Sequence, residues 1–282
     1  MTPDQYCQEK AAQSGSSFYY SFLFLPPARR RAITALYAFC REVDDVVDEC
    51  TDTGVAAQTL AWWRDELARL DHHTPTHPVT QALEPHMVPF GITIERLNLI
   101  IDGMQMDLQQ TRYLDYAGLE SYCFHVAGVV GLLAAGIFGH SDPKTLDYAK
   151  ELGIAFQLTN IIRDVGEDAR IGRVYLPMDE LQRFGVTASD LTHARYTPGF
   201  TELMRFQAQR ARATYASAYA LLPPADRNAQ RPGLIMAAIY STLLDEIERE
   251  NFQVLHQRIS LTPVRKLWIA WRTWVGTRHR RG

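Results

Sequence analysis

Two acidic runs constrain this chain more than any other feature of its sequence. Residues 41–48 read Arg-Glu-Val-Asp-Asp-Val-Val-Asp and residues 160–168 read Asn-Ile-Ile-Arg-Asp-Val-Gly-Glu-Asp, so each run places two aspartates four positions apart behind an arginine. In a helix such positions share one face, about 5–6 Å apart, where like charges repel. We expect neither run to offset this repulsion locally, because Asp45 and Glu167 add negative charge. The pattern therefore predicts a shared cation site, and Mg²⁺ fits it because that ion combines carboxylates with substrate phosphate.

The rest of the chain is predicted to be helical nearly throughout. Pro26-Pro27 precede an apolar-periodic segment that continues to Asp48, and proline is tolerated in the first turn of a helix. No long stretch alternates apolar and polar residues as a half-buried strand would. We therefore expect an all-α fold. The other expected helices, separated by proline and glycine breaks, cover residues 55–70, 93–110, 116–139, 143–165, 199–221, 233–250 and 263–275.

Length and composition favour a single domain over residues 1–282. The chain is 46% hydrophobic, enough for a substantial core, and no proline-, glycine- or serine-rich linker divides it. Its four cysteines show neither CxxC spacing nor a small disulfide framework, so reduced thiols are expected. The first residues lack the basic start and apolar stretch of a signal peptide. Together these features predict a cytoplasmic protein.

The C-terminal segment is basic and rich in tryptophan. Seven arginines and lysines follow Glu250 and no acidic residue does, whereas the part before it is acidic. A nucleic-acid-binding domain would carry a basic patch on its fold, so that class is not expected. A helix at about 263–276 could close the bundle by packing, or dock peripherally on the inner face of a membrane, where tryptophans and cations suit anionic lipid. Its predicted apolar face contains Leu267, Trp268, Trp271, Trp274 and Val275.

Residues 121–141 carry no formal charge, a length that raises the question of a membrane span. Small residues such as Ala127, Gly128 and Gly131 favour close packing inside a helical bundle instead. A helix that is apolar on all sides is more often a buried central helix in a protein of this size. We expect no transmembrane span here. We expect this helix to line an apolar cavity that has the acidic runs near one end.

An acidic metal site above an apolar interior predicts a ligand with a polyanionic head and a hydrocarbon tail. Prenyl diphosphates combine both. Mg²⁺ on the diphosphate would stabilise its departure and leave an allylic cation. Arg41 and Arg163 could hold phosphate oxygens, while aromatic rings such as those of Phe18, Tyr37 and Tyr122 could face the cation. The apolar site would also exclude water, which would quench the cation.

Three motifs follow one another along the chain. They are Tyr-Ala-Phe-Cys-Arg-Glu-Val-Asp-Asp-Val-Val-Asp (37–48), Tyr-Cys-Phe-His-Val-Ala-Gly-Val-Val-Gly (122–131) and Gln-Leu-Thr-Asn-Ile-Ile-Arg-Asp-Val-Gly-Glu-Asp (157–168). They resemble the first aspartate motif, the central helix and the second aspartate motif of the squalene/phytoene synthase family of head-to-head prenyl transferases. The resemblance extends from Ser16-Ser17-Phe18 to about Arg265. It implies an isoprenoid-synthase-type helical bundle around a central apolar cavity.

The resemblance also implies a role for each matching residue. Residues 173–177 resemble the loop after the second motif, which is expected to cover the site. The implied metal or metal–diphosphate ligands are Asp44, Asp48, Asn160, Asp164 and Asp168. The candidate catalytic residues are the same four aspartates together with Tyr37 and Tyr122. The candidate substrate-binding residues are Ser17, Phe18, Arg41, Gln157, Asn160, Arg163, Tyr175, Tyr240 and Arg258.

The family reaction would join two identical C15 or C20 diphosphates through a cyclopropyl intermediate. Residues 231–240 and 257–268 are most similar to those of bacterial presqualene diphosphate synthases of hopanoid pathways, so we expect two farnesyl diphosphates to be condensed to presqualene diphosphate. Phytoene and dehydrosqualene synthases and NADPH-dependent squalene synthases share the motifs and remain alternatives. No GxGxxG fingerprint indicates NADPH.

Two other classes of protein fit the sequence less well. A Mg²⁺-dependent nucleotide pyrophosphatase would share the paired carboxylates, but the apolar residues 126–138 supply no polar contacts for a base and sugar. A non-catalytic helical adaptor would explain the basic tail and not the two acidic runs.

Overall fold

The computed structural model describes residues 1–13, 21–22, 24–50 and 52–278. Within these ranges the fold is all-α: no β-strand occurs, and an isolated bridge joins Arg112 to Val174. The longer helices are α1 (Pro3–Gln13), α3 (Pro27–Glu49), α4 (Thr53–Asp71), α7 (Ile94–Gln109), α9 (Val129–Phe138), α10 (Lys144–Arg170), α13 (Pro198–Leu221), α14 (Arg231–Arg249) and α15 (Pro263–Arg278). The shorter ones are α5 (Pro78–Leu83), η1 (Glu84–His86), α6 (Met87–Phe90), α8 (Tyr116–Cys123), the π-helical turn η2 (Phe124–Gly128), α11 (Met178–Arg183), α12 (Ala188–Thr192) and η3 (Pro224–Asp226).

The structure confirms the predicted helices and corrects two of them in detail. The helix expected over 116–139 consists of α8, the π-helical turn η2 and α9. The helix expected to end near residue 165 continues to Arg170, so both aspartates of the second acidic run lie inside it. The polar helix α1 was not predicted, because it buries only Cys7 and Ala11 and so has little apolar periodicity.

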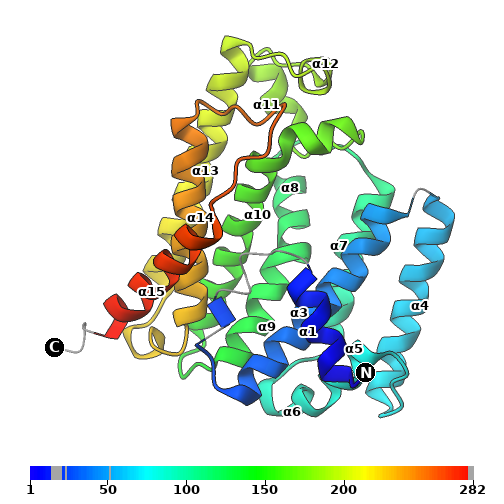
Figure 1. The fold of residues 1–282 in the computed structure, drawn as a ribbon. Helices are drawn as coiled ribbons and strands as arrows, with labels where there is room; N and C mark the ends of the chain where they lie inside the picture. Colours follow the sequence, from blue (N-terminus) through cyan, green and yellow to red (C-terminus); the bar gives the residue numbers. More distant parts are fainter. Residues whose placement is uncertain (14–20, 23, 51, 279–282) are drawn as a thin grey trace.

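The bundle is organised around α10, which runs through its middle (Figure 1) and contacts η2, α9, α13 and α14. One group of buried side chains centres on α10, α13 and α14, and a second on α3, α4 and α7. Phe124 and Val126 of η2 pack against both groups. The interior is therefore continuous, and the chain folds as one domain.

Helix ends place the two acidic runs. Pro27 occupies the first position of α3, which ends at Glu49, and Asp52 caps α4 by accepting from the backbone N–H of Gly54 at 2.8 Å. The α10 helix ends just before Gly172, whose φ of 85° suits glycine. Each acidic run consequently lies in the last turns of its helix, where the helix dipole adds to the cost of negative charge.

The uncharged segment forms the centre of the bundle. By length and composition, Tyr116–Phe138 could cross a membrane, but it packs between α3, α7 and α10. A Cβ on Gly131 would lie 2.1 Å from the Ala149 carbonyl oxygen, and one on Gly153 would lie 2.3 Å from that of Ala127. The small residues are therefore needed for close helix packing, as expected for a core helix.

The C-terminal helix α15 packs against α14 at the outer edge of the bundle (Figure 1). The structure corrects its predicted apolar face. Trp274 points toward the protein, where it stacks on Phe24 with ring centroids 4.8 Å apart, and Ile269 and Ala270 are buried. Val264, Leu267, Trp268 and Trp271 remain exposed, at 76%, 45%, 53% and 58%. The helix thus closes the bundle with one face and presents an apolar second face.

Candidate active site

The two acidic runs meet at one end of the bundle. Arg173, in the loop after α10, donates to Asp48 Oδ1 of α3 at 2.8 Å and to the Val47 carbonyl oxygen at 3.0 Å. Asp168 of α10 lies close enough to Asp48 for the two charges to affect each other. Through Arg173, the loop over residues 173–177 therefore links the end of α10 to the end of α3.

Arginines neutralise part of the acidic cluster, which corrects the expectation that neither run could offset its own repulsion. Arg41 forms ion pairs with both Asp44 and Asp45. Arg163 Nε donates to Asp164 Oδ1 at 2.7 Å, and Arg258 Nε lies 3.0 Å from the same oxygen. Although burial alone would lower the pKa of Arg163, its bond to Asp164 raises it. The arginines predicted to hold phosphate thus lie beside the aspartates, at the end of the bundle where the two acidic runs meet. We call this end the mouth of the site.

The remaining charge is still unfavourable. Burial, with the neighbouring Asp48 charge, raises the pKa of Asp44 to about 7 despite the opposing effect of Arg41. Burial, with the Asp164 charge, raises the pKa of Asp168 to about 8. No hydrogen bond or ion pair reaches the Asp168 carboxylate from the described residues, whereas Asp164 receives two arginines. Because the Asp168 carboxylate is partly buried and lacks a neutralising partner among the described residues, binding of a cation there is favoured.

Oxygen ligands that suit a hard cation are present at this end of the bundle. Asn160, one turn before Asp164, donates to Gln157 Oε1 at 3.2 Å, but its own Oδ1 is buried and finds no hydrogen-bond partner in the described structure. Buried amide oxygens are normally bonded. Among the described residues, no three aspartate, glutamate, histidine or cysteine side chains lie close enough together to form a metal cluster. The carboxylate and amide oxygens are nevertheless the ligands that Mg²⁺ prefers.

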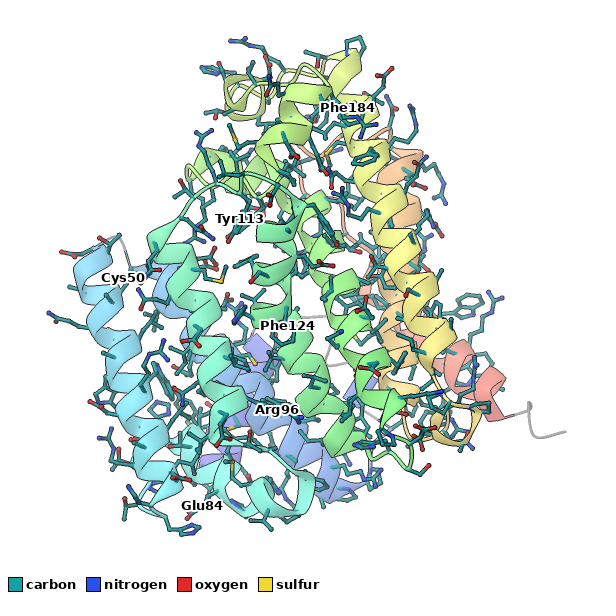
Figure 2. All side chains as sticks on the ribbon, turned by 180° about the vertical axis from the view of Figure 1, so that it is seen from behind. Cys50, Glu84, Arg96, Tyr113, Phe124 and Phe184 are labelled. Carbon is teal, nitrogen blue, oxygen red and sulfur yellow. The ribbon has the colours of Figure 1, made fainter. Side chains whose placement is uncertain are left out.

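A buried network of tyrosines stands beside the acidic runs. Asp107 of α7 accepts hydrogen bonds from the hydroxyls of Tyr122 and Tyr175, both at 2.8 Å. The rings of Tyr122 and Tyr175 stack at 5.1 Å, and Tyr113, labelled above Phe124 in Figure 2, lies 5.5 Å from Tyr122. Burial raises the pKa of Asp107 to about 6, although both tyrosine hydroxyls oppose this shift. The network fixes the two predicted tyrosines in place.

Below the mouth lies an apolar cavity of ≈ 170 Å³ between α3, α9, α10 and the start of α14. Tyr37, Gln157 and Asn160 line its polar end, and the helix expected to line it does so through Val126, Val130 and neighbouring residues. Small-molecule sites usually measure about 300–1,000 Å³. Side chains along this cavity must therefore shift for a long hydrocarbon tail to enter.

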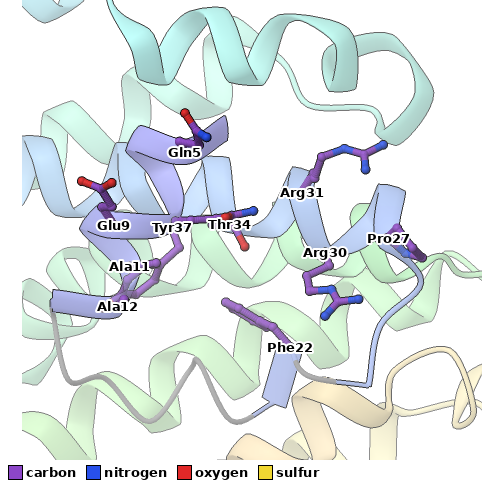
Figure 3. A pocket seen from close by; sticks show the side chains of 11 residues that line it. Gln5, Glu9, Ala11, Ala12, Phe22, Pro27, Arg30, Arg31, Thr34 and Tyr37 are labelled. Carbon is purple, nitrogen blue, oxygen red and sulfur yellow. The ribbon is translucent and has the colours of Figure 1, made fainter. Parts of the chain in front are cut away.

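A second cavity, of ≈ 610 Å³, opens between α1 and the first half of α3 (Figure 3). It shares only Phe22 and Tyr37 with the central cavity among their described lining residues. Polar and charged side chains such as Gln5, Glu9 and Arg30 line most of the rest of it, together with alanine and proline residues. This lining does not suit a hydrocarbon tail, so the central cavity is the better candidate.

Most of the predicted site residues gather around this mouth and cavity. Tyr240 is buried beside Arg163 and packs on Phe156 with ring centroids 4.9 Å apart. Ser17 and Phe18 lie outside the described residues. The structure therefore brings together the predicted aspartates, arginines, tyrosines, Gln157 and Asn160, with each predicted tyrosine on a different element.

Two residues that sequence reasoning missed, Asp107 and Lys266, also belong to this region, together with Arg173 of the predicted loop. Asp107 and Arg173 have the contacts described above. Lys266 of α15 is half-buried near Arg163 and Arg258, and burial together with these two cations lowers its pKa. The available signal for Asp107 was an aspartate between two apolar residues, Met106 and Leu108, in the helix expected over 93–110. Lys266 was missed because both interpretations of its basic segment, packing against the bundle and docking on a membrane, placed it away from the site.

Comparison with known proteins assigns this arrangement to a class of enzyme. A charged mouth above an apolar helical cavity defines an isoprenoid-synthase-type prenyltransferase, and the family model for squalene/phytoene synthase matches residues 11–265. The phytoene synthase of Arthrospira platensis is 37% identical over 274 residues, which cover 93% of this chain and 89% of that protein. The 15-cis-phytoene synthase of Synechocystis sp. is 34% identical and covers 94% of this chain and 83% of that protein.

Solved structures agree with this class. A dehydrosqualene synthase in complex with ligand has a TM-score of 0.85 at 26% identity, covering 98% of this chain and 96% of that one. The squalene synthase HpnC from Alicyclobacillus acidocaldarius has a TM-score of 0.79 at 28% identity, covering 89% of this chain and 94% of that one. The chain belongs to the squalene/phytoene synthase family. Its reaction is head-to-head prenyl transfer.

Proposed function

We propose that the protein condenses two farnesyl diphosphates into presqualene diphosphate. The observation that carries this proposal is the Asn160 Oδ1 atom, which lines the apolar cavity and has no hydrogen-bond partner among the described residues, two turns along α10 from the raised-pKa carboxyl of Asp168. The likeness to the squalene synthase HpnC and to a dehydrosqualene synthase supports a C15 substrate. The phytoene synthases among its relatives favour the alternative, a C20 substrate.

In the proposed reaction, Mg²⁺ would be held by Asp44, Asp48, Asn160, Asp164 and Asp168, and when bound it would neutralise the leaving diphosphate. Arg41, Arg163 and Arg258 would exchange carboxylate partners for phosphate oxygens, to which guanidinium groups bind through paired donors. Tyr37 would face the allylic cation from the cavity wall. The apolar lining would keep water away from that cation until the two chains are joined.

A product assay tests the proposal. With Mg²⁺ and radiolabelled farnesyl diphosphate, we expect presqualene diphosphate both with and without NADPH. Squalene formed only with NADPH would instead assign a full squalene synthase, and turnover of geranylgeranyl diphosphate alone would assign a phytoene synthase. No turnover of either diphosphate would contradict prenyl coupling by this chain.

We also propose that the protein works at the cytoplasmic membrane surface, docked through the exposed face of α15. Three of the seven basic residues in the tail point elsewhere: Arg258 pairs with Asp164, Arg265 with Glu246 at 2.6 Å, and Lys266 lies near the arginines of the site. Arg272 stays on the outer face beside Trp268, with its guanidinium 5.3 Å from the ring centroid. Exposed tryptophans beside a cation suit the interface of an anionic bilayer.

We expect the double variant Trp268→Glu/Trp271→Glu to lose at least about fivefold in co-sedimentation with vesicles that contain phosphatidylglycerol, because both charges would enter the lipid interface. Soluble turnover should persist, since both side chains point away from the bundle. Val55→Glu/Val88→Glu is the matched control, as these residues are 52% and 89% exposed on other helices. Equal vesicle binding by wild type and the tryptophan variant would exclude docking through α15.

A further inference from the structure

The central cavity has a defined floor. Along α10, its lining runs from Asn160 at the acidic mouth to Tyr148, a span of twelve residues or about 18 Å at roughly 1.5 Å per residue. One turn lower, the Thr145 hydroxyl is buried and donates to Asp226 at 2.6 Å. Phe138 is the corresponding last residue along α9. The cavity therefore ends at the level of Tyr148 and Phe138.

Tyr148 forms this floor, and its hydroxyl end packs against Gly233 of α14. Its side chain is 1% exposed, and its buried hydroxyl has no hydrogen-bond partner in the described part of the chain. The hydroxyl lies 3.0 Å from the position that a Cβ on Gly233 of α14 would occupy. A buried tyrosine hydroxyl usually finds a partner. The ring therefore acts here by its size, and Gly233 leaves the room that its hydroxyl needs.

We propose that Tyr148, seated against Gly233, sets the maximum length of the prenyl tail that the cavity accepts. This inference rests on the proposed function, because it assumes that the tail of an allylic diphosphate lies along α10. A tail that reaches the floor gains from burial of every added carbon. A tail one isoprene unit longer must displace the Tyr148 ring or leave apolar surface in water, and close-packed interiors resist such overfilling.

Binding of unreactive analogues tests the floor without requiring turnover. We would measure calorimetrically, with Mg²⁺, the affinities for farnesyl and geranylgeranyl thiolodiphosphate. Tyr148→Ala should raise the preference for the C20 over the C15 analogue at least tenfold. Gly233→Ala should lower it at least threefold, because the new methyl group pushes the ring into the cavity. In a Tyr148→Phe background this second shift should disappear, since the atom that the methyl group meets is gone.

Leu67→Ala is the control for truncating a buried side chain, because Leu67 lies in α4 and does not line the cavity; its preference should match that of wild type. An unchanged preference in Tyr148→Ala and Gly233→Ala would overturn the inference. If Tyr148→Ala does not fold, the inference is tested by comparing the analogue preference of Gly233→Ala with that of the Gly233→Ala/Tyr148→Phe double variant. If the wild-type protein binds neither analogue and turns over neither diphosphate, the proposed function itself fails.

Discussion

The Asp168→Asn variant should lose prenyl-diphosphate turnover by at least about 10³-fold, because metal-assisted departure of a diphosphate is worth several kcal/mol. Asp168 is the carboxylate of the second acidic run without a partner in the described residues, while Arg163 and Arg258 hold Asp164. Asparagine keeps the size of the side chain and removes its charge. Product formation from farnesyl and geranylgeranyl diphosphate at saturating Mg²⁺ measures the loss.

The same variant should be more stable than wild type when Mg²⁺ is removed. Burial and the Asp164 charge raise the pKa of Asp168 to about 8, so its ionised form disfavours folding. After allowing for solvent screening of a half-buried group, we expect a gain on the order of 2 kcal/mol in the free energy of unfolding. Thermal unfolding with a chelator present would reveal a rise of several degrees.

The pH dependence has a definite sign. An aspartate carboxyl ordinarily has a pKa of 3.8, whereas that of Asp168 in the folded protein is about 8. At a pH between these two values, the folded state therefore holds a proton on this carboxyl that the unfolded state has released. The free energy of unfolding of metal-free wild type should therefore fall as pH rises from about 4 to 8 at this group. Asp168→Asn should show a shallower fall, with Asp44 contributing the rest.

Asp102→Asn serves as the control for this series. Asp102 is a partly exposed aspartate of α7 that pairs with Arg64 at 2.7 Å, away from the acidic mouth. It should keep wild-type turnover and lose little stability, since exposed ion pairs contribute about 0–1 kcal/mol. Near-normal turnover by Asp168→Asn, within about tenfold of wild type, would contradict a metal role for Asp168.

Local patterns predicted the helices and the acidic runs because both depend on residues close in sequence. The four-residue spacing placed Asp44 and Asp48 on one helix, and Asp164 and Asp168 on another, before any fold was known. The short helices and α1 escaped because they bury too few residues for a periodic signal. Helical periodicity also could not show that Phe24 would draw Trp274 toward the protein, away from Trp268 and Trp271.

Contacts between distant elements could not be predicted from the sequence. Arg173 meets Asp48 only because the loop after α10 crosses to α3. The arginines of the two runs bind aspartates in this structure, a pairing that depends on rotamers and burial as well as on spacing. Asp107 has no motif at all, and its place between two tyrosines follows from the packing of α7 beside α8.

Asp107 should be a positioning residue whose loss impairs both stability and rate. It is 8% exposed and accepts the hydroxyls of Tyr122 and Tyr175. Asp107→Leu would leave both buried hydroxyls without this acceptor, at about 1–3 kcal/mol each, so chemical denaturation should show a loss on the order of 3 kcal/mol. Asp107→Asn retains one carbonyl acceptor and should lose roughly half as much.

The rate effect separates positioning from simple destabilisation. We expect Asp107→Asn to lower kcat by about 10–100-fold with little change in KM, because a misplaced catalytic group can cost about 10²-fold. Tyr122→Phe removes the other partner of the same hydrogen bond. If Asp107 acts by holding that hydroxyl, the double variant should be no slower than the worse single variant, since residues that act as a unit are not additive. If the rate losses of the two single variants multiply in the double variant, Asp107 acts independently of Tyr122. An unchanged kcat in a folded Asp107→Asn variant would exclude any role for Asp107 in the site.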